Sequence, residues 1–159
     1  MYCRNCKSKQ ITKIINVGNQ PLSNHWYIKK KYNLKKYSLD LYICKKCDLI
    51  QLKKLPKLGD MYGQNYGYRT SLSPLMINHI KEKFDRIKKY RKIKNILDIG
   101  CNDGTFLNYF SKNNNYNLYG IDPSAEKFKN YYHKKINLTV DYFSKKKIIN
   151  KYGKIKFDI

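Results

Sequence analysis

Four cysteines near the start of the chain have the spacing of metal ligands. They form two pairs, Cys3-x-x-Cys6 and Cys44-x-x-Cys47. A tight turn across each pair presents two thiolates to one ion, and two such turns supply the four soft ligands of a closed tetrahedral zinc site. Disulfides fit poorly because the N-terminal residues show no secretory signal, and free thiols would require two such pairs by accident. The spacing therefore predicts a zinc ion with a structural role.

A second group of residues, 98–104, reads Asp-Ile-Gly-Cys-Asn-Asp-Gly. A dinucleotide site needs Gly-x-Gly-x-x-Gly so that the backbone can approach a pyrophosphate, but here asparagine takes the second glycine position and no third glycine is in register. The pattern acidic-x-Gly-x-x-x-Gly is typical of enzymes that bind S-adenosylmethionine (SAM), which has no phosphate. The alternative is a plain turn in a generic α/β domain. A strand before the loop, a helix after it and an aspartate at position 122 favour the cofactor site.

The glycines and aspartates of this motif have expected positions against the cofactor. Gly100 and Gly104 would let the backbone pass close under the methionine moiety. Asp98 and Asp103 would lie near its cationic amino group, directly or through water. At the tip of the next strand, Asp122 would accept hydrogen bonds from both ribose hydroxyls, and Asp141 would accept one from the adenine amino group. The predicted cofactor-binding residues are Asp98, Gly100, Asn102, Asp103, Gly104, Asp122 and Asp141.

Two histidines and a fifth cysteine are weaker candidates for chemistry. His25 competes as a zinc ligand in principle, but a lone histidine beside Trp26 is more often a packing or substrate-side residue. His79 lies near the edge of a predicted helix's apolar stripe, so we expect it to be buried and hydrogen-bonded rather than catalytic. Cys101 is far in sequence from the cysteine pairs. We interpret it as a small loop residue, neither ligand nor nucleophile.

Alternating strands and helices must position the glycine-containing loop. Residues 95–100, 118–122 and 138–140 predict short strands, and helices are predicted from Thr105 and over 124–134. A further helix over 74–91 begins with an N-cap at Ser73, followed by a proline in the first turn. This alternation implies a parallel sheet whose ligands lie at the carboxyl ends of the strands. Nearer the N-terminus, the alternating residues 37–43 predict a half-buried strand in a small β-rich module.

Composition and charge limit the remaining possibilities. The chain has 159 residues, 42% of them hydrophobic and 14% aromatic, which excludes wholesale disorder and leaves room for about one average domain. No run of about 18 apolar residues exists, so no membrane partner is expected, and the cytoplasm is the expected compartment. The net charge of +23 suggests a polyanion partner. Because the lysines are spread over the whole chain without interleaved aromatic residues, a specific nucleic-acid site is not favoured.

Taken together, these motifs resemble one family: SAM-dependent methyltransferases with an N-terminal zinc-binding domain, which include nucleotide-sugar C-methyltransferases of deoxysugar and surface-polysaccharide pathways. Besides the cysteine pairs, the resemblance rests on segments 18–24, 62–69 and 71–73, on His79 and on the loop 97–104. It implies a nucleotide-linked sugar as the small-molecule substrate. It also implies that Tyr66 and Tyr68 line the sugar pocket. A general base would remove a proton beside the sugar's carbonyl, and the resulting carbanion would take the methyl group.

The predicted fold is therefore α/β, with a zinc-binding domain over 1–58, a tyrosine-rich connector and helix over 59–92, and a partial Rossmann-like class I methyltransferase domain over 93–159. Residues 154–159 read as the start of a fourth strand. Because the family's chains continue through the rest of the sheet, where the base is expected, we interpret this chain as truncated. Two alternatives remain: a zinc-ribbon module that binds nucleic acid, and a fragment of an RNA methyltransferase.

Overall fold

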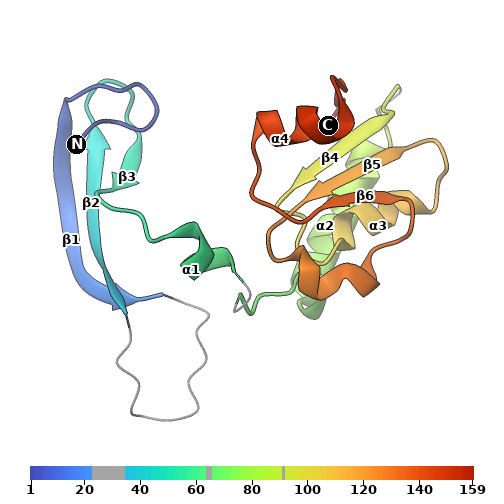
Figure 1. Ribbon diagram of the computed structural model, residues 1–159, viewed down its shortest axis with the longest axis horizontal. Coiled ribbons are helices and arrows are strands. Elements are labelled where there is room, and N and C mark those ends of the chain that lie inside the picture. The colour runs from blue at the N-terminus through green and yellow to red at the C-terminus, as the bar shows by residue number, and fades with distance from the viewer. Residues whose placement is uncertain (23–34, 64–65, 91) are drawn as a thin grey trace, which may run out of the picture. The chain divides into compact units, whose positions relative to one another are not determined.

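The computed structural model describes residues 1–22, 35–63, 66–90 and 92–159. The chain folds as two compact units, residues 1–66 and residues 67–159, shown in Figure 1. Within the described residues, no helix is long and apolar enough to cross a membrane.

The first unit is built on a three-stranded antiparallel sheet in the order β1-β2-β3. Its strands are β1 (Ile11–Pro21), β2 (Lys36–Cys44) and β3 (Ile50–Leu52), and a short helix, α1 (Leu58–Tyr62), follows them. The strand predicted over 37–43 is β2, and its side chains are half-buried as expected, although the partial burial extends to every residue of 37–43 and does not alternate along the strand. Cys44 ends this strand, so the sheet delivers one cysteine pair directly to the turn that follows.

The second unit is a parallel sheet in the order β4-β5-β6, with helices on both faces. Each predicted strand is present, as β4 (Asn95–Ile99), β5 (Asn117–Ile121) and β6 (Ile136–Thr139). Helix α2 (Pro74–Ile87) precedes the sheet, α3 (Thr105–Ser111) connects β4 to β5, and α4 (Lys145–Tyr152) follows β6. Two 3₁₀ helices, η1 (Thr70–Leu72) and η2 (Ala125–Tyr131), complete the unit. The mixed α/β fold predicted from the sequence is confirmed.

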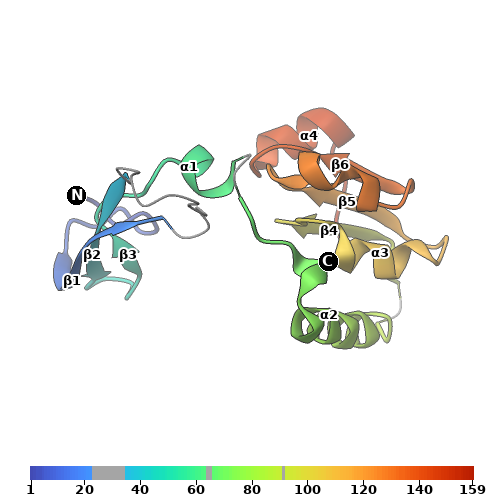
Figure 2. The same ribbon diagram turned by 90° about the horizontal axis from the view of Figure 1, so that it is seen from below.

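The core of the second unit lies between the sheet and the helices α2 and α3. Ile96, Leu107, Phe110 and Leu118 are buried there, and Phe84 of α2 packs edge-on against Phe110 with ring centroids 4.8 Å apart. Side chains alternate between the faces of a strand, so Tyr119, which follows Leu118, belongs to the opposite face of the sheet. Helix α4 covers this second face, and Figure 2 shows α2 and α4 on opposite sides of the three strands.

Helix α2 differs from its prediction in length and in the position of one side chain. Its predicted N-cap is confirmed, since the Ser73 hydroxyl accepts a hydrogen bond from the Met76 amide at 3.3 Å. The helix ends at Ile87 rather than residue 91, because the amides of Lys89 and Tyr90 donate to carbonyls only three residues back and so form separate turns. His79 is exposed, so the expectation that it is buried is wrong. It precedes the buried Ile80 by one residue and so points about 100° away from the apolar stripe.

Two further segments depart from their predicted structure. The helix predicted over 124–134 is the 3₁₀ helix η2, which ends early because Tyr132 is extended and directs its hydroxyl to the backbone of Asn102. Residues 154–159 do not form a strand. Their last two residues nevertheless lie along β4, where the Asp158 amide donates to the Asn95 carbonyl at 2.9 Å and the Leu97 amide donates to the Ile159 carbonyl at 2.8 Å.

Candidate functional site

Two turns of nearly identical geometry hold the cysteine pairs of the first unit. In one, the Lys7 amide donates to the Cys3 carbonyl at 3.0 Å; in the other, the Asp48 amide donates to the Cys44 carbonyl at 2.9 Å. Lys7 and Asp48 both adopt positive φ angles, 60° and 56°, four residues after the first cysteine of their pair. A positive φ is uncommon outside glycine, so the same unusual conformation at both places shows that the two turns are equivalent knuckles.

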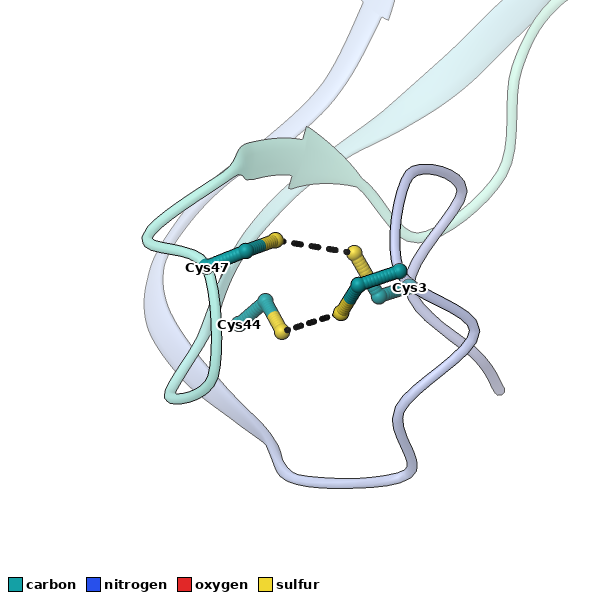
Figure 3. Close-up of side chains that lie close together, drawn as sticks. Cys3, Cys44 and Cys47 are labelled. Carbon is teal, nitrogen blue, oxygen red and sulfur yellow. Dashed lines mark hydrogen bonds between the residues drawn. The ribbon is translucent and has the colours of Figure 1, made fainter.

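The knuckles direct four sulfur atoms to one point. All four cysteine sulfurs lie within 4.8 Å of one another, with Cys3 and Cys47 3.6 Å apart and Cys6 and Cys44 3.5 Å apart. Figure 3 shows these sulfurs turned toward each other from the two loops. A zinc ion about 2.3 Å from each of four tetrahedral sulfurs needs sulfur–sulfur separations of roughly 3.8 Å. The site therefore fits zinc, and its distances are too long for the disulfide bonds considered from the sequence.

One arginine that the sequence analysis did not single out fastens the first knuckle to the sheet. The amide and guanidinium of Arg4 donate to the side-chain oxygen of buried Gln51 at 3.1 and 3.2 Å, and its guanidinium also donates to the Leu52 carbonyl at 2.6 Å. Arg4 lies between the two cysteines of its pair, so these bonds attach that turn to β3. No spacing rule marks a side chain whose partners are 47 or 48 residues away.

In the second unit, three residues of the loop between β4 and α3 have a left-handed backbone conformation. Gly100, Asn102 and Gly104 have φ angles of 80°, 47° and 76°. A side chain on Gly100 would meet nothing within 4 Å, so open space lies over this residue. A side chain on Gly104 would instead come within 2.7 Å of the Tyr132 ring. The two glycines therefore have different roles. Gly100 leaves open space above the loop, and Gly104 allows the ring of Tyr132 to pack against the backbone.

Two aspartates stand at the carboxyl ends of neighbouring strands, Asp98 within β4 and Asp122 just after β5. Asp122 is buried, and its oxygens accept hydrogen bonds from the Ser124 amide and hydroxyl, both at 2.6 Å, and from the Asn102 amide at 3.0 Å. Burial, together with repulsion from the Asp122 charge, raises the pKa of Asp98 to about 6. A cation placed between these carboxylates would relieve that repulsion.

Asn102 and Asp103, two predicted cofactor residues, point away from solvent and are 6% and 2% exposed. The side-chain amide of Asn102 forms hydrogen bonds with Thr70 and with the carbonyl of Tyr68. The Asp103 carboxylate accepts hydrogen bonds from Arg69, Ser71 and Thr105. None of these partners was identified from the sequence. Burial alone would raise the pKa of Asp103, but the hydrogen bonds from Thr105 and Ser71 hold it below its usual value. The carboxylate is thus ionised and fully engaged by the chain.

The remaining predicted residues have separate surroundings. Asp141 forms an ion pair with Lys147 at 2.5 Å, and this contact lowers its pKa. The ring of Tyr66 packs against that of Tyr62, with centroids 5.4 Å apart, whereas Tyr68 belongs to the second unit and is 38% exposed. His25 lies outside the described residues. Direct contacts of any of these side chains with substrate or cofactor stay predictions.

Cys101 lies inside the cofactor loop, yet its surroundings make it unreactive. It is 4% exposed, and its sulfur accepts a hydrogen bond from the Tyr132 hydroxyl at 3.2 Å. Burial raises the pKa of this thiol to about 12. A thiol that keeps its proton at neutral pH is a poor nucleophile and a poor metal ligand. These observations agree with the interpretation of Cys101 as a loop residue that is neither a ligand nor a nucleophile.

The residues present suit SAM, whose methionine end carries an ammonium and a sulfonium cation. Open space over Gly100 lies at the loop where the methionine end was predicted. Asp98 and Asp122 supply negative charge at the carboxyl edge of the sheet. One more polar atom is free for a ligand: the hydroxyl of Ser71 is buried without a hydrogen-bond partner in the described part of the chain.

Comparison with known proteins adds two matches and one negative result. Residues 3–62 match the family described as "Putative zinc binding domain", and residues 72–155 match the family described as "Methyltransferase domain". The first match contains all four clustered cysteines, and the second contains the loop 98–104 together with Asp122 and Asp141. A search of curated proteins gave no match.

Proposed function

The chain belongs to the methyltransferase domain family, with a zinc-binding domain ahead of the catalytic one, and on this premise we propose that it methylates a carbon atom of a nucleotide-linked sugar. SAM and zinc are its cofactors. When bound, SAM supplies an electrophilic methyl group on a sulfonium. The observation that carries methyl transfer is the open space over Gly100, two residues after Asp98, whose pKa is raised in part by the charge of Asp122.

We assign the parts of the cofactor as follows. Asp98 holds the ammonium of the methionine moiety, because a carboxylate close to a second carboxylate gains most from a neighbouring cation. Asp122 accepts hydrogen bonds from the ribose hydroxyls with oxygen lone pairs not used by Ser124 and Asn102. Asp141 takes the adenine amino group at the end of β6. Gly100 and Gly104 give the loop its shape.

The proposal of a sugar substrate is based on the tyrosine-rich segment and the zinc domain. Tyr66 and Tyr68 would contact the nucleotide-linked sugar through their rings and hydroxyls. We place the zinc domain over 1–58, the connector over 59–92 and the cofactor domain over 93–159. Four engaged cysteines leave no open coordination position, so the zinc ion stabilises the fold and takes no part in the reaction.

Transfer of a radioactive methyl group tests this proposal. The zinc-loaded chain is incubated with [methyl-³H]SAM and, in separate reactions, with nucleotide-linked keto-deoxysugars, the corresponding free sugars, and transfer RNA. The proposal predicts label only in a nucleotide-linked sugar, in a carbon–methyl bond that survives acid hydrolysis. Label in RNA, or in an oxygen-linked methyl group, would contradict it. Asp122→Asn is the matched variant: it keeps the side chain's size and should reduce the transfer of label.

A further inference from the structure

Residues 68–71, which no prediction assigned to the cofactor, are fastened to the cofactor loop of the second unit. The Thr70 amide and hydroxyl donate to the Asn102 side-chain oxygen at 2.9 and 3.1 Å, and the Asn102 side-chain nitrogen donates to the Tyr68 carbonyl at 3.1 Å. The Ser71 amide donates to the Asp103 carboxylate at 2.9 Å. Two consecutive loop residues thus use their side chains to hold one short segment.

An arginine adds charge and stacking to this attachment. Arg69 forms an ion pair with the same Asp103 oxygen at 3.4 Å, and its guanidinium lies over the ring of Tyr131 at 3.7 Å from the centroid. The Asp103 side chain is 1% exposed and that of Arg69 is 24% exposed. A buried carboxylate needs a partner for its charge, so loss of the arginine would disturb the loop itself.

The same two loop residues also reach the parts of the site assigned to SAM. The Asn102 backbone amide donates to Asp122, and the second oxygen of Asp103 accepts hydrogen bonds from the amide and hydroxyl of Thr105 at 3.2 and 2.6 Å. Thr105 is the first residue of α3. Asn102 and Asp103 therefore connect residues 68–71 on one side with Asp122 and the start of α3 on the other.

We propose that Asn102 and Asp103 are positioning residues, which act on SAM by fixing the cofactor loop to residues 68–71 rather than by touching the cofactor. Their side-chain atoms are buried and already bonded within the chain. Asn102 also holds a left-handed conformation, with φ of 47°, which the hydrogen bonds of its side chain help to stabilise. Arg69, Thr70 and Ser71 thereby become part of the cofactor site.

This arrangement couples the two substrates of the reaction, and this consequence rests on the proposed function. Tyr68, proposed to contact the sugar, offers its carbonyl to Asn102, so a sugar that orders this segment also orders the loop under the methyl donor. Each substrate should then bind more tightly in the presence of the other. The first substrate to bind orders residues 68–71, so the second binds without losing that conformational entropy again.

Two variants separate positioning from direct contact, with SAM affinity measured by calorimetry on the zinc-loaded full chain. Asn102→Gly accepts the left-handed conformation without strain but loses every side-chain bond to residues 68–71. Arg69→Gln removes the charge that pairs with Asp103 and the guanidinium that lies over the Tyr131 ring. We expect SAM to bind about tenfold more weakly to the first variant and about threefold more weakly to the second. Hydrogen exchange at the amides of Thr70 and Ser71 should become faster in both. Arg86→Gln, an exposed arginine of α2, is the control and should leave SAM affinity unchanged.

The outcomes are distinct. Wild-type SAM affinity in Asn102→Gly and Arg69→Gln, with faster exchange at residues 70 and 71, would overturn the inference, because the segment would then be released without effect on the cofactor. A loss of affinity confined to Asp103→Asn would also overturn it and show direct contact. Failure to methylate a nucleotide-linked sugar, with the expected losses of SAM affinity, would refute the proposed substrate and leave the positioning role intact.

Discussion

The ionisation of Asp98 links the stability of the second unit to pH, and the substitution Asp98→Asn tests this link. Burial and the nearby Asp122 charge raise the pKa of Asp98 from 3.8 to about 6. A carboxyl that binds its proton more tightly in the folded than in the unfolded protein makes folding less favourable once it ionises. The associated stability is therefore fully present below about pH 3.8 and lost as the pH rises through about 6.

The size of the effect follows from the same values. At about 1.36 kcal/mol per pH unit, a pKa raised from 3.8 to about 6 corresponds to roughly 3 kcal/mol of stability lost at pH 7 and above. Asparagine carries no charge at any pH. The free energy of unfolding of Asp98→Asn, minus that of the wild type, should therefore increase by roughly 2.5 kcal/mol between pH 4 and pH 8, since at pH 4 the unfolded carboxyl is already about half ionised.

Urea denaturation followed by hydrogen exchange of β4 and β5 measures the second unit by itself. The two proteins are compared at each pH, so that effects common to both cancel. Asp85→Asn is the control, because Lys88 lowers the pKa of Asp85 and its removal should give no gain of stability at high pH. A difference between Asp98→Asn and wild type that stays constant from pH 4 to pH 8 would refute the reasoning. If the carboxylate also holds the SAM ammonium, the more stable variant should bind SAM more weakly.

Two substitutions at left-handed residues should change stability in opposite directions. Gly104→Ala places a side-chain carbon 2.7 Å from the Tyr132 ring at a φ of 76°. It should therefore destabilise the second unit by about 2–4 kcal/mol, measured by urea denaturation. An unchanged denaturation midpoint would contradict the packing described for this loop. Lys7→Gly relieves the positive φ of the first knuckle and should raise the free energy of unfolding of the zinc-loaded first unit by about 1 kcal/mol, measured by the exchange of β1 and β2 amides. Lys9→Gly, at a residue without a positive φ, should give no such gain.

Much of the fold could be predicted because its signals are local. The Cys-x-x-Cys spacing predicted both knuckles, and the apolar runs around residues 98–104 predicted a strand, a loop and a helix in the order in which they occur. Ser73 was recognised as an N-cap because its partner is only three residues away. Such features need no knowledge of which distant segments meet.

The features that were missed depend on contacts between distant residues. Arg69, Thr70 and Ser71 bond to residues 32 or 34 positions further along, and no periodicity marks such pairs. The one available signal was Asn102, because an asparagine between two loop glycines is the residue most suited, after glycine itself, to a left-handed conformation. The burial of His79 was wrongly predicted because the apolar stripe of α2 was taken to include the position before Ile80. Successive residues of a helix point about 100° apart, so one position can separate a buried side chain from an exposed one.

Equilibrium dialysis with labelled SAM tests the central claim most directly, because it asks whether the loop between Asp98 and Asp122 receives this cofactor. The account predicts saturable binding of one SAM per chain, displaced by S-adenosylhomocysteine, unaffected by NAD, and weakened by Asp122→Asn. Absence of binding at saturating SAM, or displacement of SAM by NAD, would contradict it.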